Sequence, residues 1–100
     1  MKKIVLLCTA GMSTSMLVTK IREAAKAEGY DCDVNAYPVA DASSTSNDAD
    51  AILLGPQVRF QEKNLKQLFP DKPIEAIDMM SYGAMDGKKV LAQAKRMIGE

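Results

Sequence analysis

The most chemically informative part of the sequence is the segment Cys8–Ser15, which begins with a thiol. It contains one glycine, the clustered hydroxyls of Ser13, Thr14 and Ser15, and no acidic side chain. The apolar run just before it is typical of a buried strand, and the residues from Ser13 onward have a helical pattern. A helix N-terminus offers free N–H groups and a partial positive charge, which suit a phosphate or a thiolate. The segment therefore predicts a phosphate-binding turn built around a nucleophilic cysteine.

The chemistry expected of this turn is nucleophilic attack on phosphorus. A thiol beside a helix N-terminus ionises more readily than a free one, and the thiolate is the nucleophile. Cys8 would attack in line while the turn holds the equatorial oxygens. Hydroxyls at a helix start often only cap the helix, and a cysteine at a strand end is often only a core residue. Their combination with a glycine favours function, and the predicted phosphate-binding residues are Thr9, Ala10, Gly11, Met12, Ser13, Thr14 and Ser15.

Composition narrows the possible functions of the chain. Its 100 residues, expected to form one domain over 1–100, carry 13 basic and 13 acidic side chains, so no basic stripe suggests nucleic acid. There is no histidine and there are two cysteines, a combination that excludes a Cys-His couple and predicts no metal site and no cofactor. The apolar run 4–7 is too short for a signal peptide, and no stretch approaches a membrane span. We expect a cytoplasmic protein that is not inserted in a membrane.

Short apolar runs alternate with helical periodicity along the chain. Strands are predicted at 3–8, 32–37, 51–55 and 74–78, and helices at 13–28, 56–70 and 84–98. This alternation is typical of a parallel sheet with helices on both faces, in which ligands bind at the carboxyl ends of the strands. Cys8 lies at such an end, whereas Cys32 begins a strand and is expected to be a small buried residue beyond disulfide reach.

Several smaller predictions accompany this arrangement. A short helix is expected near Ala40, followed by a surface loop at 43–47. Met16 is expected to fill the core, and Leu68 is expected to face inward from the third helix. Arg59 and Lys63 are expected on the solvent face of that helix.

The segment Cys8–Ser15 resembles the active-site loop of the enzyme IIB components of the phosphoenolpyruvate-dependent sugar phosphotransferase system, lactose/cellobiose family. The segments 49–57 and 77–83 are also similar to that family, so the resemblance covers nearly the whole chain. It implies a four-stranded parallel sheet in the order 2-1-3-4, like low-molecular-weight tyrosine phosphatases and flavodoxin-like proteins. It also implies a phosphocysteine at Cys8, a phosphohistidine donor on a IIA component, and a sugar acceptor in the membrane component IIC. The protein would act as a monomer.

Two other functions use a similar turn. Low-molecular-weight tyrosine phosphatases have a cysteine, five residues, an arginine and then a serine or threonine, but Thr14 stands at the arginine position here. Without that arginine, which stabilises transition-state charge, hydrolysis should be slow. Asp78 and Asp86 lie near the place where those phosphatases carry an acid. The third possibility is a non-catalytic module that only binds phosphate.

The loops after the third and fourth strands should border Cys8. Gln57 could contact a phosphate or a partner protein, and Tyr82 could shield the phosphocysteine or meet a partner, although either could be an ordinary surface or packing residue. Asp78 could cap the turn that follows it. Methionines are adaptable and suit a surface that meets two partners, and five of the seven fall near this edge: Met12, Met16, Met79, Met80 and Met85.

Overall fold

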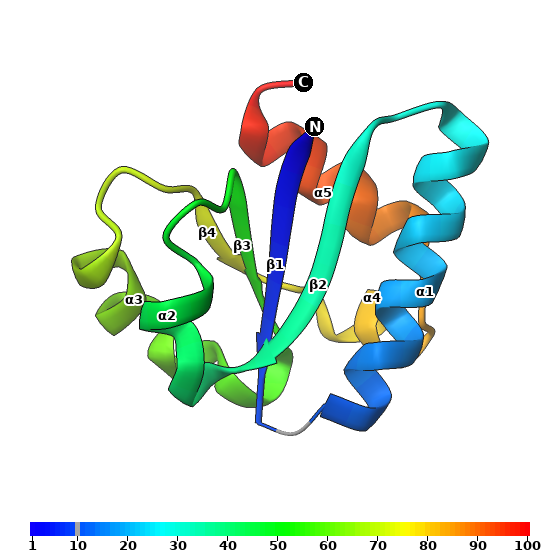
Figure 1. Cartoon of the computed structure of the whole chain (residues 1–100). Coiled ribbons are helices and arrows are strands. Elements are labelled where there is room, and N and C mark those ends of the chain that lie inside the picture. Colours follow the sequence, from blue (N-terminus) through cyan, green and yellow to red (C-terminus); the bar gives the residue numbers. More distant parts are fainter. Residues whose placement is uncertain (10) are drawn as a thin grey trace.

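The chain folds around one four-stranded sheet with helices on both sides (Figure 1). The structure is a computed structural model that describes residues 1–9 and 11–100, and for residues 11–13 the backbone only. Its strands are β1 (Lys2–Cys8), β2 (Cys32–Pro38), β3 (Ala51–Leu54) and β4 (Ile74–Ala76). Its helices are α1 (Gly11–Glu28), η1 (Val39–Asp41), α2 (Ala42–Thr45), η2 (Pro56–Gln61), α3 (Glu62–Leu68), α4 (Met79–Gly83) and α5 (Gly87–Ile98).

The sheet is parallel and its strand order is β2-β1-β3-β4, as the resemblance implied. β1 lies inside the sheet and pairs with β2 along its whole length, from Lys2 to Cys8, and with β3 from Ile4 to Leu7. All four carboxyl ends therefore lie at one edge, the lower edge in Figure 1. Cys8 pairs with Pro38 there, while Cys32 pairs with Lys2 at the opposite edge, so the expectation that the two thiols lie far apart is confirmed.

Alternating side chains of the strands form two apolar layers. Ile4 and Leu6 pack with residues of α1 and α5 on one face, and Val5 and Leu7 pack with residues of α2, η2 and α3 on the other. Four apolar residues in a row are therefore all buried, which is the pattern of a parallel strand covered on both faces. Figure 1 shows the same division of the helices about the sheet.

The predicted strands are confirmed with small changes at their ends, whereas all three predicted helices have other bounds. The helix predicted at 56–70 is the 3-10 helix η2 followed by α3, which ends at Leu68. α1 begins at Gly11 instead of Ser13, so only Thr9 and Ala10 separate it from β1. The predicted last helix from Ala84 corresponds to α5, which begins later, at Gly87, and the short helix α4 before it was not predicted. Met85 lies between them with φ 53°, in the left-handed region that ends a helix, and Asp86 then caps α5.

Three predictions about exposure are also wrong. Met16 and Leu68 are exposed rather than buried, because each lies on the outer side of its helix. Cys32 is only half-buried, because it begins the edge strand β2. Part of the expected loop at 43–47 is helical, since α2 continues to Thr45. Arg59 and Lys63 are exposed as expected.

Side chains from the helices satisfy main-chain carbonyls of both edge strands. Arg22 of α1 donates from Nε and Nη2 to the Val34 carbonyl oxygen of β2, at 3.1 and 2.6 Å. Gln93 of α5 donates to the Ala76 carbonyl oxygen of β4 at 3.1 Å. Open edges invite pairing with another chain, so these contacts favour a self-contained sheet.

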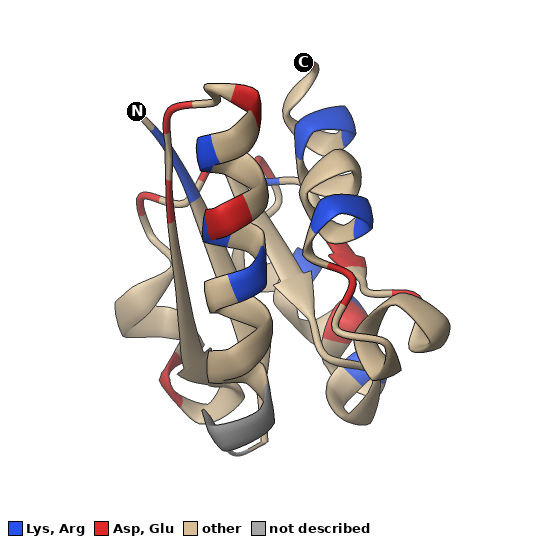
Figure 2. Ribbon diagram, turned by 90° about the vertical axis from the view of Figure 1, so that its right-hand side faces the viewer, with Lys and Arg blue, Asp and Glu red and all other residues tan. Residues whose placement is uncertain are grey.

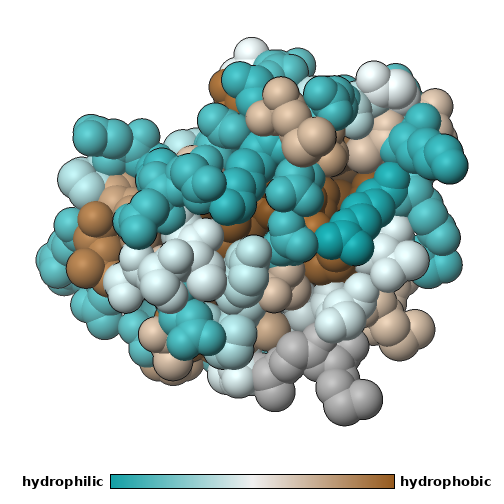
Figure 3. Space-filling view, viewed as in Figure 1, coloured by the Kyte–Doolittle hydropathy of each residue, from teal (hydrophilic) through white to brown (hydrophobic). Residues whose placement is uncertain are grey.

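Charged residues of both signs are spread over the ribbon (Figure 2), although those of α5 are all basic. Two of these basic side chains form ion pairs, Lys95 with Glu28 and Arg96 with Glu75. On the face shown in Figure 3, much of the apolar surface lies in recesses between hydrophilic residues. Among residues 1–9 and 11–100, no helix is both long and apolar enough to cross a membrane.

We expect Gly87→Ala to destabilise the fold. A Cβ at Gly87 would overlap the Lys20 carbonyl group and lie 2.6 Å from Ile21 N, and these backbone atoms of α1 cannot turn aside. The cost should be about 1–3 kcal/mol or more of unfolding free energy, the usual effect of overpacking. Denaturant unfolding measures it. The control is Gly83→Ala, since nothing lies within 4 Å of a Cβ there; equal stabilities of the two variants would contradict the close approach of α1 and α5.

Candidate functional site

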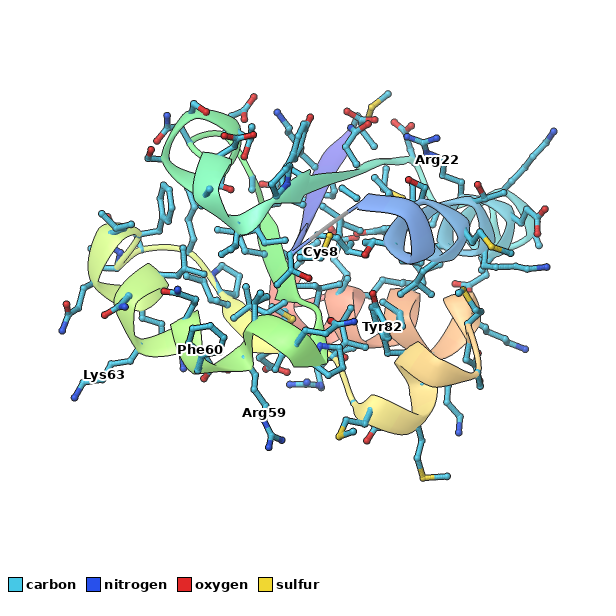
Figure 4. The ribbon with its side chains drawn as sticks, turned by 90° about the horizontal axis from the view of Figure 1, so that it is seen from below. Cys8, Arg22, Arg59, Phe60, Lys63 and Tyr82 are labelled. Atoms are coloured by element: carbon cyan, nitrogen blue, oxygen red, sulfur yellow. The ribbon has the colours of Figure 1, made fainter. Side chains whose placement is uncertain are left out.

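Cys8 lies at the carboxyl end of the sheet, beside the N-terminus of the longest helix. It is the last residue of β1, and α1 begins three residues later. Because side chains alternate along a strand, Cys8 belongs to the face of Ile4 and Leu6, which α1 and α5 cover. Its exposed fraction is 1%. The site therefore combines a covered thiol with the unpaired N–H groups of a helix start, and Figure 4 views it from the carboxyl edge.

The structure settles the place of only part of the predicted phosphate-binding turn. Thr9 is exposed, Thr14 is buried and Ser15 is exposed. Ala10 lies outside the described residues, as do the side chains of Gly11, Met12 and Ser13. The roles assigned to these seven residues remain predictions. The backbone of residues 11–13 forms the first turn of α1, so the turn is shorter than the sequence suggested.

Thr14 and Tyr82 are brought together by the fold. Thr14 Oγ1 lies 3.0 Å from Tyr82 Oη, within hydrogen-bond distance, although 68 positions separate the two residues. Thr14 belongs to α1 and Tyr82 to α4. Sequence reasoning identified both residues but not their contact, because no local pattern connects positions so far apart.

Gln57 bends back toward Cys8 across Gly55. A Cβ built on Gly55 would lie 2.7 Å from Gln57 Oε1 and 3.6 Å from the Cβ of Cys8. The side-chain amide of Gln57 and the cysteine thus both border a space that only a glycine leaves open. Sequence reasoning proposed Gln57 but gave Gly55 no role. The signal was the Gly-Pro-Gln sequence directly after an apolar strand.

The arginines do not reproduce a phosphatase site. The chain has three, and Arg22 and Arg59 are labelled in Figure 4. The Arg22 guanidinium binds Val34 and Asn35, and Arg59 projects away from Cys8. Arg96 is paired with Glu75 at 2.7 Å. None of the three arginine side chains is therefore directed at the thiol.

The two aspartates that could serve a phosphatase as an acid are helix caps instead. Asp78 Oδ2 accepts hydrogen bonds from Ser81 N at 3.1 Å and Ser81 Oγ at 3.2 Å, which confirms the predicted cap. Asp86 Oδ1 accepts from Lys89 N at 3.1 Å. Both carboxylates stabilise helix starts in the usual way.

The second cysteine is poorly suited to nucleophilic chemistry. Burial raises the pKa of the Cys32 thiol, and the neighbouring carboxylates of Asp31 and Asp33 raise it further. A raised pKa leaves less thiolate at neutral pH. Within the described part of the chain, no group of three or more potential ligands could hold a metal ion.

Comparison with known proteins identifies a family for the chain. Residues 3–93 match the family described as "PTS system, Lactose/Cellobiose specific IIB subunit". The chain is 45% identical over 96 residues to the oligo-beta-mannoside-specific EIIB component of Bacillus subtilis (strain 168), covering 94% of this chain and 93% of that protein. It is 41% identical over 104 residues to the cellobiose-specific EIIB component of Lactococcus lactis subsp. lactis (strain IL1403), covering 97% and 96%.

Solved structures show the same fold. The solution structure of a cellobiose-specific IIB component from Borrelia burgdorferi superposes with a TM-score of 0.82 and 38% identity, covering 98% of this chain and 92% of that one. The lactose-specific IIB component domain from Streptococcus pneumoniae gives a TM-score of 0.85 with 22% identity, covering 96% of each chain. The latter supports the fold alone.

We expect Gly55→Ala to move the Gln57 side chain without unfolding the protein. Gly55 has φ −59° and ψ 149°, which alanine adopts freely, but the new Cβ would meet Gln57 Oε1. NMR resonances of the Gln57 side-chain amide should shift, and the unfolding free energy should change by no more than about 0.5 kcal/mol. Gly83→Ala is the control. Unchanged Gln57 resonances in Gly55→Ala would mean that the side chain does not fold over Gly55.

Proposed function

Because the chain belongs to the lactose/cellobiose-specific IIB subunits of the sugar phosphotransferase system, we propose that it is a phosphocarrier whose phosphorylated residue is Cys8. The observation that carries the proposal is the position of Cys8, at the carboxyl end of a central strand and three residues before the N-terminus of α1. The proposed protein acts as a cytoplasmic monomer, is not inserted in the membrane, and binds neither a cofactor nor nucleic acid.

The first proposed step is acceptance of a phosphoryl group from a IIA component. The Cys8 thiolate forms an S–P bond while the P–N bond of a phosphohistidine breaks. The electron pair of that bond stays on the imidazole nitrogen, which leaves as neutral imidazole when its other nitrogen carries a proton. This chain has no histidine, which fits a donor histidine on another protein. Amides at the start of α1 would stabilise the charge on the transferred group.

The second proposed step is transfer to a sugar held by the membrane component IIC. A hydroxyl oxygen of the sugar forms an O–P bond while the S–P bond breaks, and the Cys8 thiolate is restored. The hydroxyl proton goes to a base that the acceptor side supplies. Similar relatives are named for oligo-beta-mannoside, galactose and cellobiose, so the sugar varies among close relatives. We propose a cellobiose-, chitobiose- or lactose-like disaccharide.

Hydrolysis of a phosphate ester is the second candidate, since the turn begins with the same nucleophile. Hydrolysis is disfavoured because none of the three arginines lies at the thiol. It is also disfavoured because Asp78 and Asp86 act as helix caps. A buried threonine at position 14 cannot replace a bidentate guanidinium. Because these groups would not accelerate its hydrolysis, a phosphocysteine here would persist until the acceptor arrives.

A partner surface at the carboxyl edge is part of the proposal. Each of the helices α1, η2 and α4 begins just after a strand, and each presents a large exposed apolar side chain. These are Met16, Phe60, Met79 and Met80. Two successive partners must reach the same thiol, and adaptable methionines suit such a surface. Because only 1% of Cys8 is exposed, docking must also open access to the sulfur.

Phosphorylation in the presence of phosphoenolpyruvate, the general phosphotransferase proteins and a IIA component tests the proposal. Intact-protein mass should show one added phosphoryl group on the wild-type chain and on Cys32→Ser, and none on Cys8→Ser. The Cys32→Ser variant is the matched control, because it removes the half-buried thiol at the opposite sheet edge. An adduct retained in Cys8→Ser would reject Cys8. Release of phosphate from an aryl phosphate without any adduct would favour the hydrolase.

We expect Met80→Glu to weaken docking without affecting the fold. Met80 is 82% exposed at the carboxyl edge, and a buried carboxylate in the complex would be costly. The KM for phosphorylated IIA should rise about threefold to tenfold, as for an interface residue of moderate importance.

Leu68→Glu is the matched control for this substitution. Leu68 is 61% exposed, but it lies at the end of α3, which leads away from the carboxyl edge toward the start of β4. Equal KM values for the two variants would show that donor docking does not use Met80.

A further inference from the structure

One side-chain contact connects the start of α1 to a distant part of the chain. Tyr82 Oη lies 3.0 Å from Thr14 Oγ1, and Thr14 is buried with an exposed fraction of 1%. Thr14 lies within the first turns of α1, the helix whose N-terminus follows Cys8. Hydroxyls near a helix start usually cap the helix or face water. The Thr14 hydroxyl is instead buried and lies against a tyrosine from another helix.

The tyrosine is held firmly by its own helix. The Asp78 carboxylate caps α4 at Ser81 N, Tyr82 N donates to Asp78 O at 2.9 Å, and Met85 N donates to Tyr82 O at 3.1 Å. The ring packs against the apolar layer formed by β1, α1 and α5. The Tyr82 backbone is therefore held within α4, and its ring is held by that apolar layer.

Cys8, Thr14 and Tyr82 all lie on the same face of the sheet, the face that α1 and α5 cover. Cys8 belongs by alternation to the α1/α5 face, and the apolar residues packed with Tyr82 lie on that face. Figure 4 shows Tyr82 on α4, on the side of Cys8 away from Phe60 and Lys63. The tyrosine thus reaches the helix start from the α1/α5 side of the thiol.

The chemistry of the two hydroxyls gives the contact a direction. A phenol, with an ordinary pKa near 10, is a better donor than an aliphatic hydroxyl. Either hydroxyl could donate in this contact. In the arrangement with Tyr82 as donor, Thr14 Oγ1 keeps its own proton for donation to another acceptor. A hydroxyl that accepts one hydrogen bond also becomes a stronger donor. An incoming phosphoryl group on Cys8 is such an acceptor.

We propose that Tyr82 is a positioning residue for phosphoryl transfer at Cys8, which acts by holding the Thr14 hydroxyl in place as a donor to the phosphoryl group. The proposal rests on the phosphocarrier function proposed above. Tyr82 does not touch the reacting atoms in this mechanism. Its effect should therefore appear in the rate of transfer rather than in the affinity for the donor protein.

Tyr82→Phe tests the proposal because it removes only the phenol oxygen. The kcat for phosphorylation by IIA should fall about threefold to tenfold, the usual effect of one lost neutral hydrogen bond, with KM unchanged. Tyr30→Phe is the matched control, because Tyr30 packs against the same apolar layer but precedes β2 at the opposite edge. A rise in KM with unchanged kcat would instead make Tyr82 a docking residue and would overturn the proposal.

A double-mutant cycle separates action through Thr14 from an independent effect. Thr14→Val should slow transfer, Thr14→Ser should restore most of it, and adding Tyr82→Phe to Thr14→Val should cause no further loss. If the fold-losses in rate of the two single variants instead multiply in the double variant, Tyr82 acts independently of Thr14. If the wild-type chain accepts phosphate and Tyr82→Phe is equally fast, the inference fails while the phosphocarrier function stands.

A measurement without partner proteins tests the contact itself. Amide hydrogen exchange in the segment 14–18 should be faster in Tyr82→Phe than in the wild-type chain, and unchanged in Tyr30→Phe. Equal exchange in all three proteins would show that Tyr82 does not hold this part of α1, whatever the outcome of the transfer assay.

Discussion

The structure depends on one constraint, the burial of residues 4–8 of β1 inside a parallel sheet. This strand pairs with β2 on one side and β3 on the other, and helices cover both of its faces. In a parallel sheet, each connection returns the chain to the edge at which the previous strand began. All strands therefore run in the same direction as β1. The carboxyl ends, and with them Cys8, Gly55 and Asp78, are thereby gathered at one edge.

Close approaches between segments then define the site at that edge. Gly55 leaves room beside Gln57 and Cys8, and Gly87 allows α5 to meet the backbone of α1 at Lys20. The contact at Gly87 lies on the same sheet face as the contact of Tyr82 with Thr14. The packing of α1 on α5 therefore helps to hold α1 in place beside the site. Short helices, each begun by a cap or a proline, carry the surrounding side chains.

The strands and the position of Cys8 at the carboxyl edge of the sheet could be predicted from the sequence, because both depend on local patterns. The run at 4–7 is buried throughout, and the turn after it has a distinctive composition. The short helix α4 and the later start of α5 could not be predicted, since Met85 adopts a positive φ between the two helices without the glycine that usually signals it. The contact of Thr14 with Tyr82 depends on tertiary packing, to which no local pattern points.

Thr14 distinguishes a carrier from a hydrolase in physical terms. An arginine at this position would stabilise the transition state for attack by water as well as by a sugar hydroxyl. A neutral hydroxyl, buried and held by Tyr82, offers one hydrogen bond and no charge. It would assist a nucleophile that a partner aligns but would leave unaligned water slow to react. If Cys8 carries the phosphoryl group as proposed, the site would achieve transfer through the alignment that docking provides, and hydrolysis of the phosphocysteine would stay slow when no partner is bound.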